Sequence, residues 1–533
     1  MRSVKRSPSG QYPVIGGEVR DLKRLGAEGG EGGAMDTNSS PSTAVARAGD
    51  STAAPARNRR IAVIGAGIAG LAATKVLTAV GHEVVTFDVE PDVGGVWCPT
   101  RHYPGLTTQN TRMTYEFSDH PAPSSWPDYP DAAQWHSYLR GYADRFDLGA
   151  SLRLGTGVTL AKPTADGWDL RLDNGDQVEA AHLVVANGVF SRPLIPEWPG
   201  ADAYAEAGGV VKAPSQGLTL ADARDRHVVV VGYGKSACDT AMALSAIADS
   251  VTLVPRRLFW KAAKNLLGKH FEDVAITRLG EALFGNPKVF GPVFGVLSRA
   301  TIKQQGLAPL DLIPPGRFEE ILSSSASLAT DGFFDAVRAG RITVRRDRSI
   351  AELRGGADRT GRPEAVLDDG TVLPAGLIVA ATGFEQDVPF LDNSSSLRAP
   401  DGAFELFRNV LPHQTPNLTF AGYNTSLVSS LSAEAGAIWI AAHLAGALTL
   451  PPTAQRQAQV RADLAARAAQ TRGKHASGTV VLPRSLGNID KLLGDLHAVL
   501  PRRVRMKQWS RRSFSTDFRE TFGAAVRELR SAG

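Results

Sequence analysis

The chain of 533 residues contains few cysteines and no long hydrophobic run. Cys98 and Cys238 form no C-x-x-C pair and make no disulfide framework, so a reducing compartment, and hence a cytoplasmic protein, is expected. No stretch of 18 or more uninterrupted apolar residues occurs, which argues against a transmembrane anchor and against membrane association. The 11 histidines show no zinc-type spacing with a third ligand, so we predict no metal site.

The charge is distributed unevenly along the chain. The net charge is +5 and the sequence pI about 9.1, but residues 451–533 carry 16 basic and 6 acidic side chains, and the stretch 61–450 is net acidic. A globular body of negative charge with basic ends argues against a nucleic-acid partner. We expect residues 451–533 to form arginine-rich helices that cover the body. The stretch 1–58 is rich in Gly, Ser and Pro and has no apolar periodicity, which predicts a disordered tail. Translation is expected to start at either Met1 or Met35.

Two glycine-rich loops carry most of the functional information. Gly65-Ala66-Gly67-Ile68-Ala69-Gly70 follows the apolar run 61–64, and Gly232-Tyr233-Gly234-Lys235-Ser236-Ala237 follows the run 228–231. Each loop opens an alanine-rich stretch that favours a helix. A strand, a tight glycine turn and a helix N-terminus form a pyrophosphate-binding cradle. Two cradles predict two dinucleotides, with hydride passing between them.

The residues after each cradle indicate which dinucleotide it binds. Asp88 follows the strand expected at 83–87, close to the spacing from the glycine loop at which a carboxylate meets a ribose 2′-hydroxyl. After the second cradle, the strand 251–254 ends in Pro255-Arg256-Arg257. Arginine binds a 2′-phosphate that a carboxylate would repel. We therefore predict FAD at the first cradle and NADPH at the second. Lys235 and Ser236 either contact phosphate or simply begin the helix.

The expected fold is α/β, with two doubly wound Rossmann-like dinucleotide-binding domains and the NADPH domain inserted into the FAD domain. The second domain is expected to carry a helical insertion, 258–335, whose apolar stretch 282–297 caps a site, fills a core or lies on a membrane surface. The predicted organisation is a tail at 1–58, a first FAD-binding segment at 59–212, an NADPH-binding domain at 213–376, a second FAD-binding segment at 377–450 and the basic extension 451–533.

This layout resembles the flavin-containing monooxygenases, a group that includes Baeyer–Villiger and N-hydroxylating relatives. The resemblance covers about 61–450. It rests on both cradles, Asp88, Gly94-Gly95-Val96-Trp97, Asn110, Arg256 and Ala381-Thr382-Gly383-Phe384. It implies that the first cradle and Asp88 hold the ADP half of FAD, and that Gly95, Val96 and Trp97 pack near the flavin. It also implies cofactor contacts for Asn110, Thr111, Gly383 and Gly422.

Asn110 is the one predicted catalytic residue. From spacing alone it is an Asx-turn residue before Thr111; by the resemblance its amide lies near the isoalloxazine and nicotinamide. The sequence departs from the family in two places. The F-x-G-x-x-x-H segment before the second cradle places Lys212 or Ala213 at the histidine position, and the first Ala-Thr-Gly-like segment reads Ala186-Asn187-Gly188.

The resemblance implies an NADPH-consuming monooxygenase that uses O2 and a C4a-(hydro)peroxyflavin. One oxygen atom would pass to a small organic substrate, by N- or S-oxygenation or by Baeyer–Villiger oxidation. Three alternatives remain: a flavin disulfide reductase, which lacks a suitable cysteine pair here; an NADPH oxidase that releases H2O2; and a nucleotide-sensing flavoprotein without turnover. Substrate identity and oligomeric state stay open.

Overall fold

The computed structural model describes residues 60–532, apart from 267, 287, 324–327, 357–360, 393 and 472–477. These residues belong to one compact unit, Ala54–Gly533. The predicted tail 1–58, with both candidate starts, lies outside the described residues.

The first sheet is parallel and has the strand order β22-β7-β1-β2-β3. All four residues of the central strand β1 are buried, as expected for an apolar run covered on both faces. Helix α1 (Ile68–Ala79) follows β1 directly and packs against α10 (Ser429–Leu444). The strands are β1 (Ile61–Ile64), β2 (Val84–Asp88), β3 (Leu152–Leu154), β7 (His182–Val185) and β22 (Leu418–Phe420).

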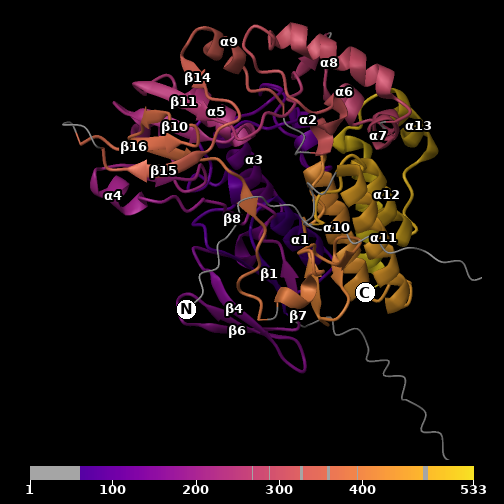
Figure 1. Cartoon of the computed structure of the whole chain (residues 1–533). Coiled ribbons are helices and arrows are strands. Elements are labelled where there is room, and N and C mark those ends of the chain that lie inside the picture. The colour runs from indigo at the N-terminus through magenta and orange to yellow at the C-terminus, as the bar shows by residue number, and fades with distance from the viewer. Residues whose placement is uncertain are drawn as a thin grey trace, which may run out of the picture. The chain divides into compact units, whose positions relative to one another are not determined.

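The second sheet is also parallel, with the order β14-β11-β10-β18-β9. Figure 1 shows β10, β11 and β14 side by side, with α5 (Lys235–Leu244) next to them. Every strand of this sheet lies between β7 and β22 in the chain, so the second sheet is inserted into the first, as predicted. Its strands are β9 (Val210–Lys212), β10 (His227–Val231), β11 (Ser250–Val254), β14 (Ile342–Val344) and β18 (Leu377–Ala380).

Two predicted domain boundaries were wrong. We expected the strand at 377–382 to return to the first sheet, but β18 pairs with β10, from Val228 opposite Leu377 to Val231 opposite Ala380. Strand β9, which we placed at the end of the first domain, pairs with β18. An apolar strand with a glycine turn suits either sheet, because both sheets bury both faces of their central strands. Only the pairing assigns it.

The chain crosses between the two sheets at one small ladder. Strand β8 (Arg192–Pro193) leads away from the first sheet and pairs antiparallel with β19 (Phe384–Glu385), which leads back. The described residues also form four further small sheets. They are β4 (Val158–Pro163), β5 (Trp168–Leu172) and β6 (Gln177–Ala180); β15 (Ile350–Arg354), β16 (Glu364–Leu367) and β17 (Val372–Pro374); β12 (Asn265–Leu266) and β13 (Lys269–His270); and β20 (Leu406–Phe407) and β21 (Leu411–Pro412).

Helices supply the remaining layers. The region 258–335 combines helices with a short hairpin, turns and loops, and most of the described part of the C-terminal extension is helical. Within the extension, α12 (Ser485–Asp495) and α14 (Arg519–Ala532) pack against α10, and Figure 1 shows α12 beside α10. None of the helices among the described residues is long and apolar enough to cross a membrane. The helices not yet named are α2 (Arg112–Tyr115), α3 (Ala132–Arg145), α4 (Ala201–Glu206), α6 (Glu272–Ala275), α7 (Arg278–Gly285), α8 (Gly291–Gln305), α9 (Phe333–Arg338), α11 (Thr453–Thr471) and α13 (Arg502–Ser510).

Candidate functional site

The first glycine loop forms the turn that a pyrophosphate needs. Gly65 has φ +112°, and a Cβ there would lie 2.4 Å from the carbonyl oxygen of Ala186 at the end of β7. A Cβ on Gly70 would lie 1.7 Å from the Gly65 oxygen, so helix and strand approach only because both residues lack side chains. These two glycines therefore shape the cradle, and their contact with a cofactor stays a prediction.

The middle glycine, Gly67, leaves space in which a ligand can approach the backbone. It precedes α1 in an extended conformation, and the nearest atom to a Cβ there is the Gly95 Cα at 3.5 Å. The short 3-10 helix Gly95–Trp97 therefore lies against the helix N-terminus, with Val96 half-buried within it. Gly422 closes the same corner, since its Cβ would lie 2.5 Å from the Ala69 Cβ. The residues predicted at 65–70, 95–97 and 422 thus converge.

Asp88 lies at the end of β2 beside this loop. Its carboxylate accepts the Ala66 N–H at 2.6 Å and the Glu90 N–H at 2.9 Å. Burial raises the pKa of Asp88, while the two backbone N–H groups oppose that shift. A half-buried acceptor next to the cradle suits a ribose hydroxyl donor.

Several polar atoms close to Asn110 in the chain are buried without a partner. They are Thr108 Oγ1, Gln109 Oε1 and Thr111 Oγ1, none of which has a hydrogen-bonding partner among the described residues. Buried polar side chains in proteins are nearly always satisfied, so this cluster fits a polar ligand. A flavin ring, with its carbonyl and N–H edge, supplies both donors and acceptors. The cradle and this cluster together therefore fit FAD.

Asn110 lies within that cluster. Its side chain is 6% exposed, and its Nδ2 donates to the Leu427 carbonyl just before α10. One N–H and the side-chain oxygen stay available for other partners. Asn110 lines a narrow cavity together with Gln109, Tyr129, Phe271, Glu272, Ala275, Ile276, Leu328 and Leu427. Much of this lining comes from the helical insertion.

Glu272 is a charged member of this lining that sequence reasoning missed. The residue is 4% exposed, and its carboxylate accepts the Thr111 N–H at 3.2 Å and the Thr114 hydroxyl at 2.6 Å. Arg512, from the C-terminal extension, donates to the same carboxylate at 2.8 Å. A single acidic residue in a helix and an arginine in a basic tail form no motif, and we found no sequence signal that joins them.

The second glycine loop repeats the geometry of the first. Gly232 has φ +124°, and its Cβ would lie 2.4 Å from the Ala381 oxygen. Around Gly234, at the N-terminus of α5, a Cβ would meet nothing within 4 Å. Ala237 is fully buried, as a packing position requires. Gly383, predicted as a cofactor residue, belongs to the segment that backs this second turn.

Lys235 has a protein partner. Its ammonium pairs with the Asp239 carboxylate, and Thr107 Oγ1 lies 3.4 Å away. Burial lowers the pKa of Lys235, and Asp239 opposes that shift. A phosphate contact by Lys235 or by half-buried Ser236 stays a prediction.

The two arginines after β11 differ in their surroundings. Arg257 lies 3.8 Å from the Glu320 carboxylate. Arg256 is exposed, and among the described residues it has no ion-pair or hydrogen-bond partner. Arg256 is therefore the freer of the two to bind a 2′-phosphate.

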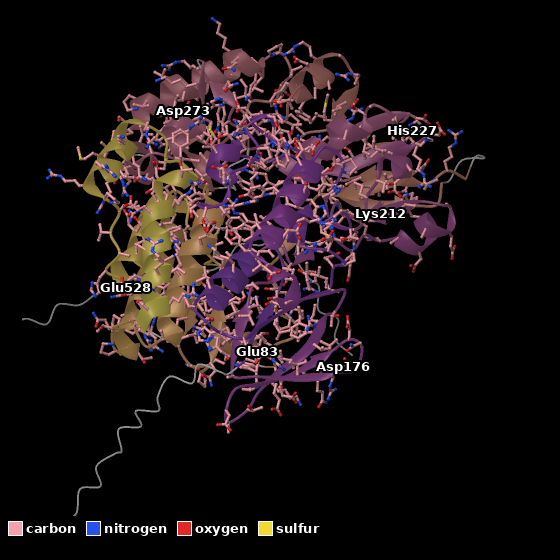
Figure 2. The ribbon with its side chains drawn as sticks, turned by 180° about the vertical axis from the view of Figure 1, so that it is seen from behind. Glu83, Asp176, Lys212, His227, Asp273 and Glu528 are labelled. Carbon is pink, nitrogen blue, oxygen red and sulfur yellow. The ribbon has the colours of Figure 1, made fainter. Side chains whose placement is uncertain are left out.

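The segment that lacks the family histidine is held by other contacts. Lys212, at the end of β9, pairs with Asp222 at 2.7 Å (Figure 2). The Tyr204 ring lies where a side chain on Gly209 would be, 2.4 Å from its Cβ position, and the Tyr204 hydroxyl donates to the Ala375 carbonyl at 2.7 Å. The segment is thus braced by an ion pair and an aromatic contact.

Comparisons with known proteins agree with this geometry. Residues 58–293 match the family model described as Flavin-binding monooxygenase-like. Flavin-containing monooxygenase 1 of Homo sapiens is 26% identical over 419 residues, which cover 74% of this chain and 75% of the human protein. Cyclohexanone monooxygenase from Rhodococcus sp. Phi1, solved bound to NADP+, aligns with a TM-score of 0.62 and 20% identity over 82% of this chain and 97% of that one. S-allyl-L-cysteine S-oxygenase of Allium sativum aligns with a TM-score of 0.57 and 19% identity over 89% and 99%.

The fold and the cradles define a flavoprotein with two dinucleotide-binding sheets. The matches to the family model and to flavin-containing monooxygenase 1 support the resemblance that the sequence predicted, and they indicate a flavin-dependent monooxygenase by class. The description of the matching family model also supports a bound flavin as cofactor.

Proposed function

We propose that this enzyme is an FAD-dependent, NADPH-consuming monooxygenase that passes one oxygen atom of O2 to a small organic substrate. The observation that carries the proposal is the pair of glycine cradles, in which Gly67 and Gly234 each stand at the start of a helix with no close side chain around them. The unpartnered polar atoms of Thr108, Gln109 and Thr111 add to it. When bound, a flavin accepts hydride from the nicotinamide and activates O2.

The chain's own residues bind and orient the cofactors in this proposal. Gly67 admits the pyrophosphate to the N-terminus of α1, and Asp88 accepts from the adenosine ribose. Arg256 binds the 2′-phosphate that distinguishes NADPH from NADH. Asn110, held by Leu427, offers its remaining amide N–H to the reacting oxygen, and the apolar lining of its cavity keeps water out.

The substrate class is proposed only as a nitrogen or sulfur nucleophile or a ketone. The neighbours include an S-oxygenase and a cyclohexanone monooxygenase, and both kinds of reaction suit a site without a catalytic triad or an acid–base carboxylate pair. The test is oxygen consumption and product analysis with FAD-loaded protein, NADPH and a panel of amines, sulfides and ketones. An oxygenated product supports the proposal, whereas flavin that NADPH fails to bleach contradicts it.

One alternative has an observation in its favour. Lys212 or Ala213 stands at the position of the histidine that the family places before the second cradle, and Lys212 is paired with Asp222. In this alternative, NADP+ is therefore retained without that histidine. An enzyme that releases NADP+ early would act as an NADPH oxidase. Stoichiometric H2O2 with every substrate tested would establish this alternative.

A further inference from the structure

Among the described residues, the C-terminal extension contacts the Asn110 segment, residues 110–118, directly at two points and reaches it through Leu427 and Glu272 at two more. Ser515 Oγ donates to the Met113 carbonyl at 3.2 Å, and Arg519 Nε donates to the Ser118 carbonyl at 2.8 Å. Ser485 Oγ accepts the N–H of Leu427, whose carbonyl in turn binds Asn110. The fourth contact is the Arg512–Glu272 pair. The extension lies outside the match to the family model, which ends at residue 293.

The Arg512–Glu272 pair is the most informative of these contacts. The Arg512 side chain is 12% exposed and that of Glu272 5%, so the pair is screened little by water. The Glu272 carboxylate is shared among Arg512, the Thr111 N–H and the Thr114 hydroxyl. Without the arginine, this carboxylate would be a buried charge held only by neutral donors, and its position would no longer be fixed. The residue it would release is the direct neighbour of Asn110.

We propose that Arg512, acting through Glu272, is a positioning residue that holds the Asn110 segment in place for oxygen transfer. This inference rests on the proposed function. It gives the basic extension a role in the reaction. Arg512 follows Glu272 by more than two hundred residues, and through Glu272 it fixes the backbone position of Thr111, which lies far earlier in the chain.

Asp273 offers a matched control on the same arginine. Its carboxylate lies 3.4 Å from Arg512 Nε and accepts the His270 N–H, but within the described part of the chain it makes no hydrogen bond to residues 110–114. Asp273 is labelled in Figure 2 on the helical insertion. Asp273→Asn removes the same charge one position along, so it separates a general loss of charge near Arg512 from loss of the Thr111 contact.

The experiment compares Arg512→Gln, Glu272→Gln, Arg512→Lys and Asp273→Asn in the FAD-loaded full-length protein. Hydrogen exchange of a peptide that spans Thr111 is measured first. Because the Thr111 N–H binds a charged acceptor, we expect its exchange to be about ten- to a hundredfold faster in Arg512→Gln and Glu272→Gln. Asp273→Asn should exchange like the wild type, and Arg512→Lys should lie between. Thermal melting confirms that each variant is folded.

The second measurement is the ratio of H2O2 released to NADPH oxidised, with the best substrate of the panel. We expect this ratio to rise several-fold in Arg512→Gln and Glu272→Gln, with little change in the KM for NADPH. Unchanged exchange at Thr111 in both variants overturns the inference, whatever the protein catalyses. Faster hydrogen exchange at Thr111 with an unchanged ratio of H2O2 to NADPH also overturns it. A wild type that forms no oxygenated product contradicts the proposed function instead, and the exchange measurement still decides whether Arg512 positions the segment.

Discussion

At the scale of single residues, Asn110 combines a structural and a chemical task. Its side chain donates to the Leu427 carbonyl, which ties the segment after β2 to the start of α10. An aspartate at this position keeps the size but loses the donor, and it brings a negative charge towards a carbonyl oxygen. The residue therefore tests whether donor character, rather than shape, matters at the cavity.

We predict that Asn110→Asp still binds FAD but releases several-fold more H2O2 per NADPH oxidised. The visible spectrum reports FAD binding, and a peroxidase assay measures H2O2. Asn174→Asp, on an exposed turn, is the control and should behave like the wild type. Equal H2O2 release per NADPH oxidised in all three proteins would contradict a role for Asn110 in the reaction.

Arg256 carries the second prediction at this scale. Arg256→Ala should raise the KM for NADPH by about tenfold or more, the effect of losing a hydrogen bond to a charged group, and leave the KM for NADH almost unchanged. Arg257→Ala should have a smaller effect, because Arg257 already lies near Glu320. Steady-state kinetics with both coenzymes measure the difference, and parallel increases in both KM values would argue against a 2′-phosphate contact.

The sequence predicted the cradles well and the environment of Asn110 poorly. Gly65 and Gly70 were identifiable because a Cβ at either position would lie within 2.4 Å of a carbonyl oxygen, which leaves room for no other residue type. Gly67 was identifiable because it completes the spacing of a pyrophosphate-binding turn. Glu272, Leu427 and Arg512 were not identifiable. Their roles depend on tertiary contacts between distant segments, and no local pattern encodes such a contact.

At the scale of elements, the N-terminus of α1, which follows the central strand of the first sheet, is where the pyrophosphate is expected to bind. Gly67 has an extended conformation that any residue can adopt, and a Cβ there meets only ordinary contacts. A side chain at this position can therefore be tolerated by the fold while it obstructs the pyrophosphate.

We predict that Gly67→Val folds but fails to retain FAD. The purified variant should be colourless and show a far-UV circular dichroism spectrum like that of the wild type. Gly149→Ala, at a glycine with no atom within 4 Å of its Cβ, is the control and should stay yellow. Retention of flavin in Gly67→Val would place the pyrophosphate elsewhere.

Helix α10 supplies a prediction about pH. Glu434 on this helix is 2% exposed and accepts from the N–H and the hydroxyl of Ser118. Burial, followed by the charge of Asp119, raises the pKa of Glu434 from 4.5 to about 7. The stability gained from the protonated form is therefore complete below pH 4.5 and is lost as the pH rises through 7.

Glu434→Gln carries a neutral side chain at every pH. The difference in free energy of unfolding between this variant and the wild type should therefore shift in favour of the variant between about pH 5 and pH 8, by on the order of 2–3 kcal/mol. Melting temperatures at both pH values measure this change. Glu83→Gln, on the exposed pair with Arg60 (Figure 2), should show no comparable trend. A gap between Glu434→Gln and the wild type that is constant with pH would contradict the raised pKa.

The elements also show where sequence reasoning reached its limit. Strands β1, β2, β10 and β11 were predicted because each is an apolar run next to a glycine turn or a charged end. Strand β18 was predicted as a strand but assigned to the wrong sheet. The sequence 377–380 is apolar throughout and fully buried, so it fits the centre of either sheet, and its partner is decided by the path of the whole chain.

At the scale of the whole molecule, the cofactor is expected to stabilise the fold. The first cradle is built from β1, α1, β2 and residues near β22, so a bound FAD contacts segments that span most of the chain. A ligand that binds only the native state stabilises it by about 2.7 kcal/mol when present at about 100 times its Kd. We predict that removal of FAD lowers the melting temperature by several degrees. Differential scanning calorimetry with and without added FAD measures this shift, and Gly67→Val should show none.

The polypeptide passes from one sheet to the other and back through a single ladder of two residues on each side, β8 and β19. Gly188 and Gly383 flank this ladder, with φ values of +80° and +105° and no atoms close to their Cβ positions. Any swing of the coenzyme half about the flavin half would be concentrated in the torsions of these few residues. Local stiffening at Gly383 would then alter how fast the two halves reorient, while leaving both nucleotide sites intact.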